Sequence, residues 1–249
     1  MKPKYYLRKH TFIFVSLLFT FHYSLFTPKD IMAQQKGMNF KVEVEKDVIL
    51  EVRFLLYLPE GYDRSEDKYP LMLFLHGSGE RGDMLDLVKK NGPPMLIGQG
   101  QSFPFIVVSP QCPLEDTAWS VEVLDMLLDE MVSRYRVNEK CIFVTGLSMG
   151  GAGTWNLAIA YPNRFAAIAP VCGYVDPSLA SAIKNLPVWV FHGAKDDVVS
   201  PDQSINMVNA LKALGNPVKF TLYPDANHDS WTETYNNPEV YEWLMGNCQ

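Results

Sequence analysis

The chain has 249 residues, of which 47% are hydrophobic and 20% are charged, and its formal net charge is −6. This composition excludes an intrinsically disordered chain, and one domain of this length can bury a full core. Basic residues do not cluster beyond the first 30 positions, so nucleic acid is not expected as a partner.

The N-terminal segment has the pattern of a secretory signal peptide. A basic start is followed by an apolar run at residues 12–21 and then by the small residue Ala33. We expect cleavage after Ala33, which removes residues 1–33 and leaves 34–249 as a single domain with 17 basic and 27 acidic residues, a net charge of −10. The alternative is an uncleaved anchor, although the uncharged stretch 11–27 is slightly short for a span of about 20 residues. The pattern predicts a secreted or periplasmic protein with no stable membrane span in its mature form.

The next elements in the chain predict an α/β fold. Two alternating stretches, Phe40–Glu45 and Ile49–Leu58, flank a charged turn at Lys46-Asp47 and predict an antiparallel hairpin. Apolar runs typical of buried strands follow at 70–75, 105–109, 142–145, 166–171, 188–191 and 218–223. Helices are expected between them at 121–135, 151–160 and 203–214, where the apolar residues have helical spacing or the residues are small and apolar. This alternation predicts a mostly parallel central sheet with helices on both faces, and chemistry in the loops after the strands.

A candidate nucleophile follows the run at 142–145. Gly146-Leu147-Ser148-Met149-Gly150 has the form G-x-S-x-G between a strand and a helix, which presents a serine on a sharp turn. The glycines allow close backbone approach, and the helix directs its N-terminal dipole toward the reacting oxygen. A chance match in a glycine-rich turn is the alternative. The strand–turn–helix context favours Ser148 as the nucleophile.

Chain order selects the histidine that would activate Ser148. In this architecture the order is serine, acid, histidine. His76 precedes Ser148, and His192 precedes its nearest acids. His228, in a polar loop after the run at 218–223, is therefore the expected base.

The acid is expected in the loop after the run at 188–191. Asp196 and Asp197 both lie there, and spacing alone does not choose between them. The acid would hold the imidazole in one tautomer and stabilise its charged form. The other aspartate would be an exposed loop charge or a helix cap.

Backbone amides are expected to stabilise the oxyanion of the reaction. One is the N–H of Met149, directly after the nucleophile. The other comes from the glycine-rich loop after the run at 70–75, where Ser78 is the first choice and Gly79 the alternative. An ordinary turn is the competing interpretation of this loop.

Four further side chains are candidates for shaping the site. Trp119 and Trp231 are expected at the rim, where an indole suits a planar acyl group or a sugar ring; loop packing is the alternative for both. Glu80 and Arg81 are adjacent in the oxyanion loop and are interpreted as an ion pair, either stiffening that loop or solvated and weak.

The cysteines are Cys112, Cys141, Cys172 and Cys248, which allow three disulfide pairings in an exported protein. Buried free thiols are equally consistent with their apolar surroundings. Their spacings match no metal site, so neither a metal nor another cofactor is expected.

Four motifs together resemble the α/β-hydrolase superfamily. They are GLSMGG at the nucleophile, LFLHGSGERG at the oxyanion loop, FHGAKDDVVS at the acid loop and ANHDSW at the histidine loop. More narrowly, from about Lys41 onward, the chain is similar to secreted esterases and peptidases related to polyhydroxybutyrate depolymerases and feruloyl esterases. The acid loop of that family has the form HGxxDxxV, which falls on Asp196 and Val199 and implies Asp196 as the acid.

We therefore expect a secreted serine esterase that acts through an acyl-enzyme on small-molecule or polysaccharide-linked esters, including acyl groups on plant polysaccharides. A serine peptidase with the same triad is one alternative. A non-catalytic binding module on a hydrolase scaffold is another, although such a module usually loses a triad member. Fold and triad host many acyl donors, so the sequence does not fix the substrate or the oligomeric state.

Overall fold

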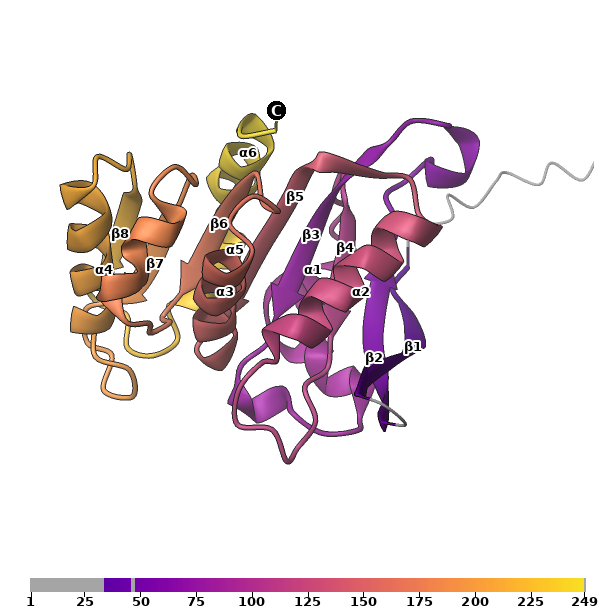
Figure 1. Cartoon of the computed structure of the whole chain (residues 1–249), viewed down its shortest axis with the longest axis horizontal. Coiled ribbons are helices and arrows are strands. Elements are labelled where there is room, and N and C mark those ends of the chain that lie inside the picture. The colour runs from indigo at the N-terminus through magenta and orange to yellow at the C-terminus, as the bar shows by residue number, and fades with distance from the viewer. Residues whose placement is uncertain (1–33, 46–47, 249) are drawn as a thin grey trace, which may run out of the picture. The chain divides into compact units, whose positions relative to one another are not determined.

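The computed structural model describes residues 34–45 and 48–248, so the expected signal peptide and the turn at Lys46-Asp47 lie outside the described residues. One sheet of eight strands runs through this part of the chain, in the order β1-β2-β4-β3-β5-β6-β7-β8 (Figure 1). The strands are β1 (Lys36–Glu45), β2 (Val48–Tyr57), β3 (Tyr69–Leu75), β4 (Ile106–Pro110), β5 (Val137–Leu147), β6 (Ala167–Val171), β7 (Trp189–Gly193) and β8 (Lys219–Tyr223).

Strand pairing confirms the predicted mostly parallel sheet with its N-terminal antiparallel hairpin. β1 pairs antiparallel with β2, which is the expected hairpin, and β2 pairs antiparallel with β4. All remaining neighbours, from β4 to β8, pair in parallel. The chain leaves β3 toward β4 on one side and leaves β5 toward β6 on the other. The topological switch point therefore lies at the carboxyl ends of β3 and β5, where open α/β sheets bind ligands.

Helices cover both faces of the sheet. Figure 1 shows α2 (Val121–Arg134), α3 (Met149–Ala160) and α4 (Asp202–Ala213) in front of it. Their buried side chains share one apolar cluster. The other face is covered by α1 (Gly92–Gly98), α5 (Trp231–Asn236) and α6 (Pro238–Gly246), whose buried side chains join a second cluster.

Strand β3 shows why the inner strands are continuously apolar. Leu71, Leu73 and Leu75 belong to the cluster beneath α2, α3 and α4, whereas Met72 and Phe74 belong to the opposite cluster. Side chains alternate between the faces of a strand, and both faces here are covered by helices. All five side chains are consequently buried.

The short helices were not expected from the sequence. They are α1, α5, α6 and the 3₁₀ segments η1 (Tyr62–Arg64), η2 (Ser78–Glu80), η3 (Leu85–Lys90) and η4 (Pro177–Ile183). Segments of this length contain too few turns for a periodic apolar stripe. Prolines also open α1, where the missing N–H has no helical partner to lose. Within the described ranges, no helix combines the length and apolar character needed to cross a membrane.

The four cysteines divide into one disulfide and two buried free thiols. Cys141, on β5, is bonded to Cys248, which follows α6, with their Cα atoms 4.7 Å apart. Cys112 and Cys172 are free and buried. The disulfide joins the central sheet to the end of the described chain.

Candidate active site

Ser148 lies on a sharp turn between β5 and α3, with φ 53° and ψ −115°. Positive φ costs a non-glycine residue about 1–3 kcal/mol and persists where the surrounding structure enforces it. A Cβ added to Gly150 would lie 1.9 Å from the carbonyl oxygen of Leu75, and one added to Gly146 would lie 2.4 Å from that of Gly150. The two glycines thus permit the close backbone passage that the turn requires. The Ser148 side chain makes no capping bond to α3, which leaves its hydroxyl available to other partners.

A continuous hydrogen-bonded chain joins Ser148, His228 and Asp196. The Oγ of Ser148 lies 3.0 Å from Nε2 of His228, and Nδ1 of His228 lies 2.8 Å from Oδ2 of Asp196. The three residues follow β5, β8 and β7, respectively. The structure therefore brings together the three side chains that the sequence singles out.

Asp196 is buried and is held from several directions. Its Oδ1 accepts hydrogen bonds from the backbone N–H groups of Val198 and Val199, each at 2.9 Å. Burial by itself would raise the pKa of this carboxyl, but the hydrogen bonds from His228, Val199 and Val198 outweigh it and lower the pKa below its ordinary value. Asp196 is therefore a carboxylate at neutral pH. Asp197, the alternative acid, is exposed.

A second histidine reaches the same carboxylate. Nε2 of His192 lies 3.1 Å from Oδ2 of Asp196. Chain order removes His192 from consideration as the base, but it gives the residue no other role. The only signal in the sequence is its position four residues before Asp196 in the same loop.

The two expected oxyanion donors are the first residues of two helical segments that follow neighbouring strands. Ser78 opens η2 just after β3, and Met149 opens α3 just after β5. β3 and β5 are parallel neighbours, with Leu75 in register with Gly146. Considering only residues with a described placement, neither the Ser78 nor the Met149 N–H donates to a protein acceptor. These two amides are therefore available to a ligand oxygen, and the dipole of α3 favours negative charge there.

A neutral histidine joins the oxyanion loop to the segment that follows β4. His76 is fully buried; its Nδ1–H donates to the Gly77 carbonyl at 2.6 Å, and its Nε2 accepts from the Cys112 N–H at 3.0 Å. Burial lowers the pKa of His76 to about 4. Trp119 packs on this imidazole with ring centroids 4.8 Å apart and donates its Nε1–H to the His76 carbonyl at 3.3 Å. Only 9% of Trp119 is exposed, which favours loop packing over the expected place at the rim.

Trp231 links the histidine loop to the oxyanion loop through Asn91. Its ring lies beside His228, and its Nε1–H donates to Oδ1 of Asn91 at 3.2 Å. Nδ2 of Asn91 donates in turn to Oε1 of Glu80 at 3.0 Å. Sequence reasoning missed Asn91, which carries no local motif and lies 140 residues from Trp231.

The expected pairing of Glu80 with Arg81 is wrong. Glu80 is buried, and burial raises the pKa of its carboxyl. Arg81 turns outward instead, with its Nε–H donating to the Ser78 carbonyl at 3.0 Å and its Nη1–H to the Asp116 carbonyl at 2.7 Å. The two side chains diverge because the backbone amide of Gly77 and the side chain of Asn91 bind the acid, while loop carbonyls bind the guanidinium.

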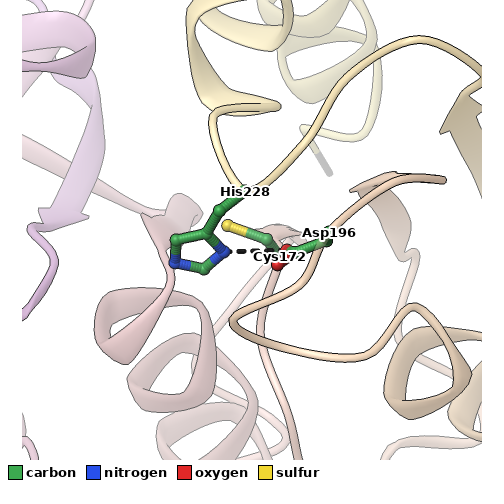
Figure 2. A group of neighbouring side chains, drawn as sticks. All are labelled: Cys172, Asp196 and His228. Carbon is green, nitrogen blue, oxygen red and sulfur yellow. Dashed lines mark hydrogen bonds and ion pairs between the residues drawn. The ribbon is translucent and has the colours of Figure 1, made fainter.

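Cys172 completes the surroundings of the acid. Figure 2 shows its side chain beside Asp196 and His228, and potential ligand atoms of the three lie within 4.8 Å of one another. Burial raises the pKa of this thiol to about 12, so the sulfur is protonated at neutral pH. A metal requires a deprotonated thiol and an imidazole nitrogen free of its proton. His228 instead bonds to Asp196 through Nδ1 and to Ser148 through Nε2, so the triad arrangement accounts for this cluster.

The sheet order and the loops that carry these side chains define an α/β-hydrolase fold. The chain belongs to the dienelactone hydrolase family, whose sequence profile matches residues 114–242. That segment contains Ser148, Asp196 and His228.

Sequence relatives and solved structures agree with this assignment. The chain is 28% identical over 169 residues to a probable feruloyl esterase C of Aspergillus terreus, covering 63% of this chain and 59% of that protein. It is 26% identical over 140 residues to a bifunctional acetylxylan esterase/xylanase of Neocallimastix patriciarum, covering 54% of this chain and 20% of the relative. These alignments span less than two thirds of either relative.

Two solved structures share the fold. The crystal structure of a thermostable esterase superimposes with a TM-score of 0.72 at 31% identity, covering 84% of this chain and 62% of that chain. A ferulic acid esterase from Anaeromyces mucronatus, solved with ferulic acid, gives a TM-score of 0.64 at 17% identity, covering 87% of this chain and 92% of the other. At 17% identity the likeness is evidence for the fold alone.

Proposed function

We propose that this protein is an exported serine esterase that cleaves carboxylic esters through an acyl-enzyme. The observation that carries the proposal is the hydrogen-bonded chain from Ser148 through His228 to Asp196. Nucleophile, base and acid are all present within hydrogen-bonding distance, as acyl transfer requires. An intact chain of this kind also argues against a non-catalytic binding module.

In the proposed reaction, Oγ of Ser148 attacks the ester carbonyl carbon while Nε2 of His228 takes the hydroxyl proton. Asp196 stabilises the resulting imidazolium. The N–H groups of Ser78 and Met149 would bind the oxyanion, a contribution for which a single donor is worth about 10²–10³-fold in turnover. Collapse of the intermediate breaks the ester C–O bond, and the imidazolium gives its proton to the leaving alcohol.

The acyl-enzyme is then hydrolysed by water. His228 takes one water proton as the hydroxide adds to the acyl carbonyl, and the same two amides would bind the new oxyanion. The intermediate expels Oγ of Ser148, which regains the proton from His228. The products are the carboxylic acid and the free enzyme.

The substrate class that fits best is an acyl ester on a plant polysaccharide. Relatives named feruloyl esterase and acetylxylan esterase support it. Large apolar side chains are exposed on the segments that follow β3, β4, β6 and β7, the strands whose carboxyl ends face the site: Met84, Leu114, Tyr174 and Val198. The half-buried Trp231 beside His228 offers an aromatic face to a planar acyl group or a sugar ring.

The proposed export is supported by the pattern of residues 1–33 and by the Cys141–Cys248 disulfide, since such bonds persist in oxidising compartments. Sequencing the N-terminus of protein recovered from the exported fraction tests it. We expect Gln34 as the first residue. An intact Met1 in that fraction would favour an anchor.

The catalytic proposal is tested with Ser148→Ala. The control is Ser133→Ala, a substitution that removes an exposed hydroxyl of α2. Each variant is treated with a fluorophosphonate probe and assayed on aryl acetates, methyl ferulate, feruloylated and acetylated xylan fragments, and peptide amides. We expect Ser148→Ala to lose labelling and ester hydrolysis and Ser133→Ala to keep both. Turnover near that of the parent in Ser148→Ala would refute the triad, and faster hydrolysis of amides than of esters would favour a peptidase.

A further inference from the structure

His192 is a fully buried histidine whose two ring nitrogens both have partners. Nε2 lies 2.9 Å from the Val199 carbonyl oxygen and 3.1 Å from Oδ2 of Asp196. Both partners are acceptors, so Nε2 carries the proton. Nδ1 then accepts a hydrogen bond from the hydroxyl of Ser204, whose Oγ lies 2.7 Å away. Ser204 is in the first turn of α4. The tautomer of His192 is therefore fixed by its surroundings.

The nitrogens of two imidazoles consequently lie close to the same oxygen of the acid. Oδ2 of Asp196 lies 2.8 Å from Nδ1 of His228 and 3.1 Å from Nε2 of His192. Burial lowers the pKa of His192, so the ring that faces the carboxylate is neutral. The titratable groups acting on His192 are Asp196, which favours its protonation, and His228, which opposes it. The proton that moves during turnover is thereby confined to the His228 side.

We propose that His192, oriented by Ser204, is a positioning residue that fixes the second oxygen of Asp196 and shares its negative charge. The inference rests on the proposed triad. Val198 and Val199 bind Oδ1, whereas Nε2 of His192 is the second imidazole nitrogen beside Oδ2. Without it, Oδ2 would keep His228 as its one side-chain donor.

This role predicts a characteristic change in the pH–rate profile. A carboxylate that loses one donor concentrates more charge on its remaining partner, so the imidazolium form of His228 is held more tightly. The acid limb of kcat/KM, which reports the essential base of the free enzyme, should then move to higher pH. Loss of orientation should lower kcat about tenfold, the factor expected for one charge-assisted hydrogen bond, with KM little changed.

The test compares four variants after circular dichroism shows that they are folded. His192→Leu removes the donor; His192→Gln can return an N–H to the position of Nε2; Ser204→Ala removes the partner that orients the ring. Ser109→Ala, the matched control, deletes a buried hydroxyl on β4 that has no hydrogen-bond partner among the described atoms. Each is assayed on an aryl acetate from pH 4 to 9, with active sites counted by fluorophosphonate labelling.

We expect the acid limb to move upward in His192→Leu, to move less in Ser204→Ala, to return toward the parent in His192→Gln and to stay in place in Ser109→Ala. An unmoved limb with kcat within twofold of the parent in folded His192→Leu would overturn the inference. If His192→Leu does not fold, an unmoved limb in Ser204→Ala has the same force. Failure of the triad itself would appear separately, as retained activity in Ser148→Ala.

Discussion

The indole of Trp231 stands perpendicular to the imidazole of His228, with ring centroids 5.3 Å apart and an interplanar angle of 90°. The edge-to-face arrangement is a favourable aromatic geometry, worth about 0.5–1.5 kcal/mol beyond area burial. Because the same indole is bonded to Asn91, the orientation of His228 depends on a residue from a distant segment.

We therefore expect Asn91→Asp to impair turnover while leaving the triad residues unchanged. The substitution keeps the acceptor for Trp231 but replaces the donor to Glu80 with an oxygen, which places two carboxyl groups in contact. Turnover should fall about tenfold, the cost of one lost bond to a charged group. The measurement is kcat on an aryl ester, with Asn138→Asp, which changes a half-buried amide at the start of β5, as the control. Equal rates in both variants would contradict a role for Asn91.

Asp196→Asn should be far more damaging than Asp197→Asn. An asparagine at position 196 keeps the shape but can hold the imidazole in the wrong tautomer, at a cost of roughly 10⁴-fold in turnover in a protease triad. Asp197 is exposed, so its substitution should change turnover by less than about twofold. Both variants are compared by circular dichroism and by hydrolysis of one ester. A dead Asp197→Asn beside an active Asp196→Asn would reverse the assignment.

Gly150→Ala should prevent the nucleophile turn from forming. Its Cβ would lie 1.9 Å from the Leu75 carbonyl oxygen, a backbone atom that cannot move without displacing β3. We expect a loss of more than about 4 kcal/mol in the free energy of unfolding, the range that marks severe steric disruption. Gly98→Ala is the control, because a Cβ there meets nothing within 4 Å. Urea unfolding measures both, and equal stability would show that the turn tolerates a side chain.

The buried His76 predicts loss of stability in mild acid. Its pKa is about 4 in the folded protein against 6.5 as the ordinary value, so between these pH values the unfolded chain binds a proton that the folded protein excludes. Stability from this group is complete above pH 6.5 and is lost as the pH falls toward 4, about 3 kcal/mol at most. His192, whose pKa is also lowered, adds a loss of the same sign.

Urea unfolding at several pH values from 4 to 7.5 measures this slope in the parent and in His76→Asn. We expect the variant to be less stable at pH 7 but to lose less stability on acidification. A slope as steep as that of the parent would show that His76 titrates normally.

The sequence predicted the parts of the fold in which local pattern and burial agree. The inner strands are apolar on both faces, and the nucleophile turn carries glycines that the geometry requires, so each left a signal within a few residues. Chain order was enough to choose His228, and the structure brings it to Ser148.

The rest depends on contacts between distant segments. Asn91 lies in a stretch with no apolar period, and its partners Glu80 and Trp231 are fixed only once α1 and α5 pack on the sheet. The pairing proposed for Glu80 and Arg81 failed because adjacency in sequence does not decide which neighbour satisfies a buried acid. Trp119 was expected at the rim because its loop follows a strand end, but its Nε1–H donates to the His76 carbonyl at the start of the oxyanion loop.

The Cys141–Cys248 bond has a consequence for proteolysis. The two cysteines are 107 residues apart in sequence, and the segment between them contains Ser148, Asp196 and His228. A single cut anywhere in that segment leaves two fragments that remain covalently joined and keeps all three side chains in one molecule. Nicked protein would migrate as an intact chain until a reductant separates the pieces, so a protease can open a surface loop in this segment without releasing any of the three side chains.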